Sequence, residues 1–123
     1  MKAIPDTQVV WSGKVKTTNG EEFSEVFDAS RFNNFVLVVE CSAITGTNLT
    51  FDVYTNASGG ANPPTGLWEK IKDNAITITA ASCISATLPD PTDKKNLGVK
   101  FMISVTGNTL TTATFSAYIV RRL

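Results

Sequence analysis

Apolar and polar residues alternate with a period of two along most of the chain, and no window of about a dozen residues keeps the spacing of an amphipathic helix. The clearest alternation runs from 34 to 43, where one face carries Phe35, Leu37, Val39, Cys41 and Ala43. The opposite face begins with Val36 and Val38. We therefore expect a strand whose first half is covered on both sides, by a partner or by an arm of the chain.

Two further segments repeat this pattern. Residues 49–56 place Leu49, Phe51 and Val53 on one face. In the segment 97–120 the sequence TGNT, at 106–109, has the composition of a turn. It separates two apolar rows, Leu97, Val99, Phe101, Ile103 and Val105 before it and Ala113, Phe115, Ala117 and Ile119 after it. The segment 97–120 is therefore predicted to be a hairpin at the centre of the core.

These segments, together with TQVVWSGKV, EFSEVFD, LWEKIK, AITITAA and CISATL, make about nine short strands with turn signals between them. That pattern predicts an all-β fold, an antiparallel two-sheet β-sandwich of the jelly-roll type. Residues 9–123 form one predicted domain, and residues 1–8 are predicted to be an extended N-terminal arm. Two loops without strand character follow at 57–66 and 89–96.

Composition removes several classes of function. The 123 residues hold eleven basic and eleven acidic side chains, so a general attraction to nucleic acid or to anionic lipid is not expected. No histidine is present, which excludes Ser-His-Asp triads, Cys-His dyads and ordinary zinc sites. No nucleotide-binding glycine motif occurs. Catalysis by lysine or carboxylate stays open, but we predict no enzyme, cofactor or metal. Cys41 and Cys83 are predicted to be buried free thiols.

The N-terminus has no apolar block of the length that a signal peptide or a membrane span requires, so synthesis and folding in a cytoplasm are expected. An acidic segment, EEFSEVFD at 21–28, is interpreted as an exposed charged edge, with calcium binding and acid-base chemistry as alternatives. The basic side chains of Lys94, Lys95, Lys100, Arg121 and Arg122 are expected to meet at one end of the final hairpin. They form a solvated rim there or pair with acidic groups of a neighbouring subunit.

Four aromatic residues are able to stack on a sugar ring, although packing in the core or at its rim also explains them: Trp11, Tyr54, Trp68 and Tyr118. Trp68 is the first candidate because it follows the Gly- and Pro-rich loop at 57–66. A carbohydrate-binding or adhesive module is therefore one hypothesis for the function.

The order of the parts suggests a second hypothesis. An alternating strand leads through a Gly-containing turn to LTFDVYTN, a loop and LWEKI, and the chain closes with a strand, a TG turn and TFSAYIV. This arrangement, from about residue 8 onward, resembles small structural β-sandwich proteins of tailed bacteriophages. The resemblance implies a virion protein that decorates or cements the capsid as an oligomer, often a trimer, and carries over no catalytic residue. A subunit of the tail or baseplate is the alternative within the same class.

On this reading the partners are further copies of the chain, forming a homo-oligomer with the trimer favoured, and the major capsid protein or another virion protein. Nucleic acid and membrane are not expected as partners, carbohydrate is a possible ligand, and the location is the virion. The N-terminal arm is expected to order on a neighbouring subunit. The predicted interface residues are Ile4, Pro5, Trp11, Trp68, Lys94, Lys95, Arg121 and Arg122.

Overall fold

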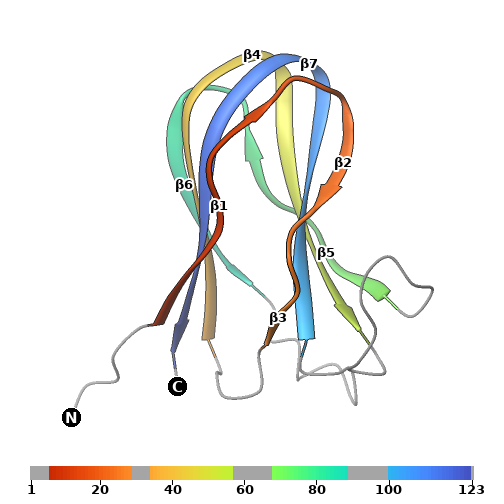
Figure 1. Cartoon of the computed structure of the whole chain (residues 1–123), viewed down its shortest axis with the longest axis vertical. Helices are drawn as coiled ribbons and strands as arrows, with labels where there is room; N and C mark the ends of the chain where they lie inside the picture. Colours follow the sequence, from red (N-terminus) through yellow and green to blue (C-terminus); the bar gives the residue numbers. More distant parts are fainter. Residues whose placement is uncertain (1–5, 29–33, 57–67, 89–99, 123) are drawn as a thin grey trace.

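The computed structural model describes residues 6–28, 34–56, 68–88 and 100–122 of the chain. These residues form one antiparallel sheet of seven strands (Figure 1). In chain order the strands are β1 (Asp6–Lys16), β2 (Gly20–Phe23), β3 (Phe27–Asp28), β4 (Asn34–Asn56), β5 (Trp68–Ile78), β6 (Ser82–Leu88) and β7 (Lys100–Arg122). No helix is present within these ranges.

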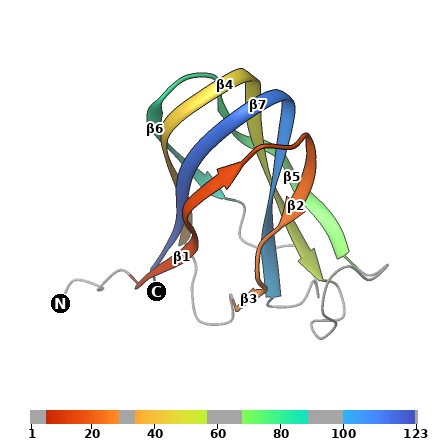
Figure 2. The same cartoon turned by 45° about the horizontal axis from the view of Figure 1, so that its top comes forward.

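The two long strands, β4 and β7, pair with each other over almost their whole length, and both bend sharply at the same place (Figures 1 and 2). The bend lies where Gly46 is opposite Leu110 and Asn48 is opposite Asn108. Gly46 and Thr109 both have positive φ there, 135° and 47°. The side-chain amide of Asn108 donates to Oδ1 of Asn48 at 2.6 Å, which ties the two corners together.

Because both central strands bend together, the sheet folds onto itself and makes two layers. The first layer has the strand order β1-β7-β4-β6, using the second half of β7 and the first half of β4. The second layer has β2 and β3 beside the first half of β7, then the second half of β4 and β5. β2 and β3 follow one another along the same edge of β7, so each layer is four strands wide. Two facing layers joined by strands that pass from one to the other are the jelly-roll arrangement, so the predicted fold class is confirmed.

The predicted hairpin at 97–120 is wrong for the residues that the structure describes. β7 does not fold back on itself, since both of its halves pair with β4. The Gly-containing turn predicted just before LTFDVYTN, at residues 44–48, is likewise a corner within β4. Gly and Asn adopt the backbone angles of a hairpin turn and of a sharp bend within one strand equally well. The residues that predicted turns therefore form bends here. Two pairs of predicted strands therefore merge into β4 and β7.

The core lies between the layers and is built from the apolar rows that alternation predicted. Its fully buried residues include Phe35, Leu37, Val39 and Cys41 of β4, Leu49, Phe51 and Val53 after the corner, and Phe101, Ile103, Val105, Ala113, Phe115, Ala117 and Ile119 of β7. Ala43 is exposed, contrary to the prediction, because a register shift between Cys41 and Ala43 interrupts the alternation. Leu97 and Val99 lie outside the described residues.

The described chain begins inside the sheet. Asp6, Thr7 and Gln8 pair with Arg121, Val120 and Ile119 as the first residues of β1. The predicted arm at 1–8 therefore overlaps the first strand by three residues, and its residues 1–5 lie outside the described part. None of the described segments forms a helix with the length and hydropathy that a membrane span requires.

Candidate interaction surfaces

Seven of the eight predicted interface residues fall into three groups. Ile4, Pro5, Lys94 and Lys95 lie outside the described residues. Trp68 begins β5 opposite Asn56, and Arg122 ends β7 opposite Asn34, with the backbone alone described. Trp11 packs inward, with its ring 5.8 Å from that of Phe115 and 6.3 Å from that of Phe51. Packing against the core thus explains Trp11.

The basic residues of β7 come to one end of the molecule. Lys100 begins the strand and Arg121 and Arg122 close it, and the bend in β7 places both of its ends at the same end of the fold (Figure 1). The two ends of β7 therefore lie together because the strand is bent, not because it forms a hairpin. That the basic side chains meet there stays a prediction, since Lys94 and Lys95 lie outside the described residues. Arg121 is 9% exposed, so its residue is buried rather than part of a solvated rim.

The outer face of the first layer carries a continuous apolar strip across three strands. Register places Val36 opposite Val120, and places Tyr118 between Val38 on one side and Val9 on the other. Val9 is 52% exposed, and the other four side chains are half-buried. We call these five residues the valine strip. The first half of 34–43 was predicted to be covered on both sides, but within the described chain Val36 and Val38 are only half-buried on this outer face. A partner or an arm that covers the face therefore stays a prediction.

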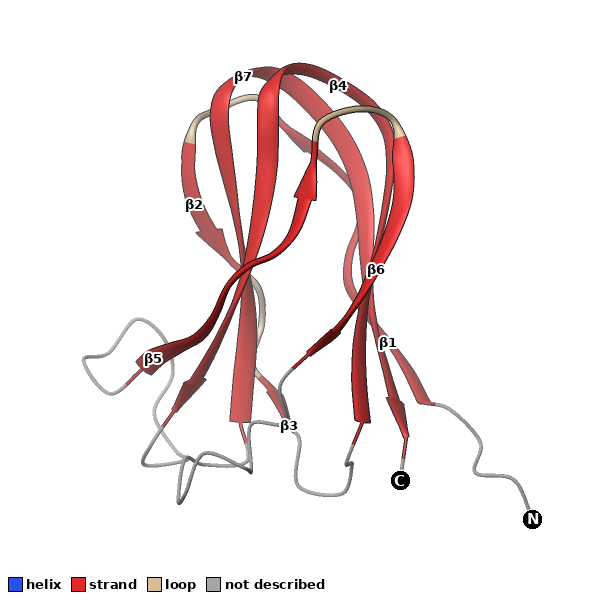
Figure 3. Ribbon diagram, turned by 180° about the vertical axis from the view of Figure 1, so that it is seen from behind, coloured by secondary structure: helices blue, strands red, loops and turns tan. Residues whose placement is uncertain are grey.

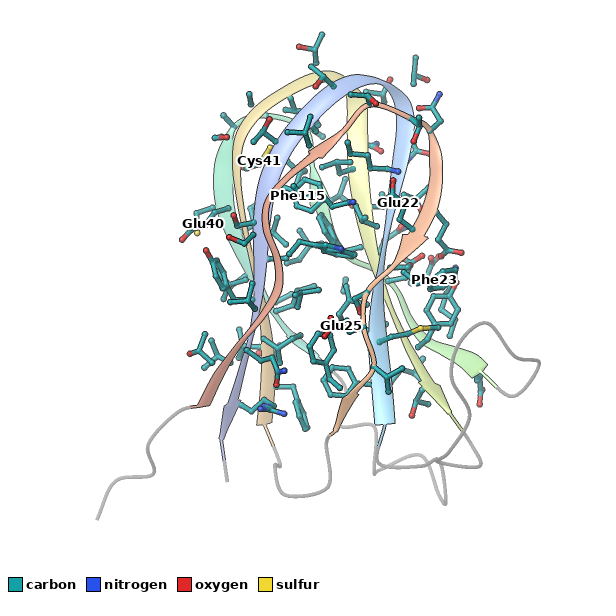
Figure 4. The ribbon with its side chains drawn as sticks, in the orientation of Figure 1. Glu22, Phe23, Glu25, Glu40, Cys41 and Phe115 are labelled. Carbon is teal, nitrogen blue, oxygen red and sulfur yellow. The ribbon has the colours of Figure 1, made fainter. Side chains whose placement is uncertain are left out.

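Charge is almost absent from this face. Among the described side chains of the first layer that point away from the core, Glu40 is the one that is charged (Figure 4). The neighbouring outward positions include the hydroxyl-bearing residues Thr7, Ser85, Thr87, Thr114 and Ser116. A further valine, Val15, is opposite Thr114 and is 58% exposed. An apolar strip bordered by uncharged polar groups has the composition of a protein contact surface, since a dry contact does not have to desolvate buried charges.

A shallow depression of about 410 Å³ adjoins the strip where the first layer begins to bend. Its lining includes Glu40, Ser42, Cys83, Thr114 and Ser116. The hydroxyl of Ser116 accepts a hydrogen bond from the backbone N–H of Gly13 at 2.8 Å. Glu40 is the one carboxylate of this lining, and its neighbours there are hydroxyl groups and the Cys83 thiol, so the depression holds no pair of carboxylates for acid-base chemistry.

Both cysteines are free, as predicted, but one of them is not buried. Cys41 points into the core, and burial raises the pKa of its thiol. Cys83 is exposed because β6 pairs with β4 in a register that places it opposite Glu40, on the outer face. The prediction of two buried thiols is therefore wrong for Cys83. The sequence held the signal, because alternation in SCISATL places Cys83 on the same face as Ser85, opposite to the face of Ile84.

The outer face of the second layer is different in kind, because it carries a network of charged and aromatic groups. The Tyr54 hydroxyl and the Ser104 hydroxyl both donate to Oε2 of Glu21 at 2.8 Å. The ring of Phe23 meets that of Tyr54 edge-on, with centroids 5.4 Å apart. Burial and the Glu21 carboxylate together raise the pKa of Tyr54. The phenol is therefore a hydrogen-bond donor in this network and not a base at neutral pH.

Asp52 extends this network to β5. Its carboxylate is buried, accepts the backbone N–H of Asn74 at 2.7 Å and lies 3.2 Å from Nζ of Lys70. Burial alone would lower the pKa of Lys70, but the hydrogen bond to Asp52 outweighs it, and the pKa is raised above its usual range. Lys70 also sits 5.6 Å from the centroid of the Tyr54 ring. These groups hold strands together and leave no free nucleophile with a base.

The predicted acidic edge proves to be partly a bridge between the layers. Glu22 on β2 binds two lysines of β1, Lys14 at 2.7 Å and Lys16 at 2.9 Å. The hydrogen bonds from Lys14 and then Lys16 lower the pKa of Glu22. Glu25 is exposed, as predicted. Among the residues that the structure describes, no three acidic or thiol side chains gather closely enough to hold a metal ion.

No family model matches the chain, and no curated protein matches it in sequence. Several solved structures are similar at low identity. A protein of the Bacillus endospore appendages, described as disulfide-linked pili, is 11% identical with a TM-score of 0.49, over 99% of this chain and 90% of that chain.

The Yersinia pseudotuberculosis-derived mitogen is likewise 11% identical with a TM-score of 0.49, over 96% of this chain and 86% of that chain. The coat protein of Tobacco streak virus is 9% identical with a TM-score of 0.46, over 98% of this chain and 85% of that chain. Likenesses this remote carry no argument about function. The surfaces of the chain itself must supply that argument, and they are a nearly uncharged outer face on one layer and a charged network on the other.

Proposed function

We propose that the protein is a non-enzymatic structural subunit of a virion, a decoration protein that binds the head of a tailed bacteriophage as an oligomer. The observation that carries the proposal is the valine strip on the outer face of the first layer. One of its five apolar side chains is exposed and four are half-buried, with Glu40 as the charged neighbour among the described residues. The sequence resemblance to small phage β-sandwich proteins supplies the class of partner.

The two layers divide the proposed work. The first layer offers the strip to another protein surface, and the major capsid protein is the proposed partner. The second layer, with Glu21, Asp52 and Lys70 engaged in hydrogen bonds and ion pairs, keeps a hydrated face toward solvent. The N-terminal residues 1–5, which include Ile4 and Pro5, act in this proposal as an arm on a neighbouring subunit. A trimer is the oligomer that the resemblance implies.

A binding experiment with assembled particles tests the proposal. Purified protein is mixed with heads and, separately, with tails of the source virus, and occupancy is measured by co-sedimentation and by immunogold electron microscopy. Val38→Lys places a charge at the centre of the strip and is expected to weaken binding to heads by about tenfold or more. Thr77→Lys, at an exposed position on the second layer, is the matched control and should bind like wild type.

The outcomes separate the alternatives within the class. Binding to tails but not heads would assign the chain to the tail or baseplate. Absence of wild-type protein from purified virions would contradict the virion assignment altogether. Equal binding of wild type and Val38→Lys, with the variant folded, would show that the valine strip is not the contact.

A carbohydrate-binding module is the second candidate, favoured by the aromatic pair of Phe23 and Tyr54 beside the Glu21 carboxylate. An aromatic face next to a hydrogen-bonding acid is a common way to hold a sugar ring. A glycan array probed with wild type, Tyr54→Ala and Trp68→Ala tests this hypothesis. Glycan binding that both variants lose, with their folding intact, would favour adhesion over decoration.

A further inference from the structure

The strands at the margins of the two layers differ in how their outer edges are protected. The first layer is bounded by β1 and β6, and the second by β2 with β3 and by β5. The outer edge of such a strand presents backbone N–H and C=O groups without a partner strand, which can template pairing with another chain. Proteins usually block such edges with bulges, inward-pointing charges or very short strands.

Three of these margins carry such blocks. β1 has two register shifts against β7, a Gly13 with φ of 56°, and the inward lysines Lys14 and Lys16. β2 and β3 are four and two residues long. β5 has two register shifts against β4, an Asn74 with φ of 51°, and charged residues throughout its first half.

β6 carries none of these blocks. Its seven residues, SCISATL, include no charge, no glycine and no proline. It pairs with β4 residue by residue, from Ser82 opposite Cys41 to Leu88 opposite Phe35, without a register shift. Its other edge pairs with no strand of the described chain, and that edge lies on the side of the molecule viewed in Figure 3. The free edge of β6 is therefore regular, uncharged and, at seven residues, long enough to pair with another strand.

We propose that β6 pairs antiparallel with β6 of a second copy, so that two first layers form one continuous sheet. This inference rests on the proposed self-association and names its contact. An antiparallel pairing of identical strands is two-fold symmetric, and centring it on the middle residue places Ser85 opposite Ser85 of the second copy. The same register places Ile84 opposite Ala86 on the core side, where both residues are half-buried against the core.

The second copy fits this edge better than a charged partner does. β6 brings no like charges into opposition with itself, and the whole chain has no net charge to repel its own copy. A two-fold axis perpendicular to the sheet keeps both outer faces on one side. The two valine strips would then be presented together to a single particle surface, which doubles the contact without a new surface. A trimer would require a different contact.

Charge substitutions at the symmetric position test the pairing. Ser85 is exposed and uncharged, so Ser85→Lys and Ser85→Glu each place two like charges face to face only if the copies pair as proposed. Sedimentation equilibrium should show the dissociation constant of the dimer rising by about tenfold or more for either variant alone. An equimolar mixture of the two variants should regain dimerisation, because the opposed charges then attract. Thr77→Lys serves as the control for an added surface charge.

A crosslinking experiment tests the register independently of charge. Ser85→Cys in a Cys83→Ser background should form a disulfide-linked dimer on mild oxidation, because residues directly opposite in an antiparallel pair bring their β-carbons close enough. Thr77→Cys in the same background should not. Urea unfolding of each variant establishes that it is folded before its assembly is interpreted.

The outcomes distinguish this inference from the proposed function. An oligomer whose mass is unchanged by Ser85→Lys, and that does not crosslink through Ser85→Cys, overturns the β6 contact but leaves decoration standing. A wild-type protein that is monomeric at all concentrations overturns both. A wild-type protein that dimerises through β6 but does not bind heads overturns decoration alone.

Discussion

The ion pair between Lys16 and Glu22 joins the two layers at the margin formed by β1 and β2, and neutralising its two members should have unequal effects. The Lys16 side chain is 0% exposed, with Nζ 2.9 Å from one oxygen of Glu22, while Nζ of Lys14 lies 2.7 Å from the other oxygen. Glu22→Gln leaves the buried ammonium of Lys16 facing a neutral amide. Lys16→Met removes that ammonium, keeps a long apolar side chain, and leaves Glu22 with Lys14.

The burial of the two side chains sets the expected difference in the free energy of unfolding between the two variants. Removing one partner of a fully buried ion pair costs about 3–5 kcal/mol. Glu22 is 37% exposed. Water therefore screens the pair, and the amide oxygen of glutamine still accepts a hydrogen bond, so we expect Glu22→Gln to lower the free energy of unfolding by about 2 kcal/mol. Lys16→Met should stay within about 1 kcal/mol of wild type, because a well-packed apolar side chain replaces a costly buried charge.

The effect of pH has a defined sign. Hydrogen bonds from Lys14 and Lys16 lower the pKa of Glu22 below its ordinary value of 4.5. A carboxylate whose folded pKa is depressed stabilises the protein above that ordinary value, and the contribution is lost as pH falls through the folded pKa. The difference between wild type and Glu22→Gln should therefore be full at neutral pH and shrink in acid.

Urea unfolding of the three proteins, at neutral pH and at about pH 3, measures these quantities through the midpoint at constant slope. The result that would refute the reasoning is an equal loss for Glu22→Gln and Lys16→Met. A gap between wild type and Glu22→Gln that is unchanged in acid would refute it as well. Either result would mean that the ion pair does not hold the margin between the layers.

Three further outcomes follow from single features of the fold. A thiol reagent should label the exposed Cys83 at once and the buried Cys41 only as the protein unfolds, because burial raises the pKa of the Cys41 thiol; two fast thiols would contradict this. Phe115→Ala should cost about 3–5 kcal/mol in urea unfolding, since the ring is buried between the layers. Thr109, with φ of 47°, pays for a β-branched side chain in the left-handed region. Thr109→Asn should therefore raise the free energy of unfolding by about 1 kcal/mol, and Asn74→Thr, at φ of 51° in β5, should lower it by a similar amount; unchanged stability in both variants would contradict the reasoning.

The apolar rows of the core could be predicted from sequence because each one depends on alternation within a single strand. Phe35, Leu37 and Val39 lie on one face whatever strand they pair with, and the same is true of Phe101 and Ile103. The rows fail only where the backbone departs from regular geometry. Ala43 is such a case, because a register shift follows Cys41 and no residue type in that segment marks it.

The strand order could not be predicted in the same way. The same turn-forming residues can make either a hairpin turn or a bend that carries one strand from one layer to the other. Gly46, Gly107 and Asn108 lie at or beside corners that carry a strand from one layer to the next, and a hairpin would use the same residue types. What decides the matter is the pairing of β4 with β7, between residues about sixty apart at the corner. No local rule reports a contact at that separation, so the sequence indicated the number of bends but not their direction.

The candidate contact surfaces depend on strand pairing even more than the strand order does. Tyr118 and Val120 stand between core residues of β7 and would be taken for the outer face of a hairpin, while Val36 and Val38 were already notable on β4. They become one strip only because β7 lies between β4 and β1 in a register that aligns them. The open edge of β6 depends on the same pairing, since a strand is marginal only when its neighbours are known. A chain with no net charge and no evident chemistry can thus acquire two distinct outer faces, and the asymmetry between them arises when the folded sheet sorts uncharged residues to one layer and paired charges to the other.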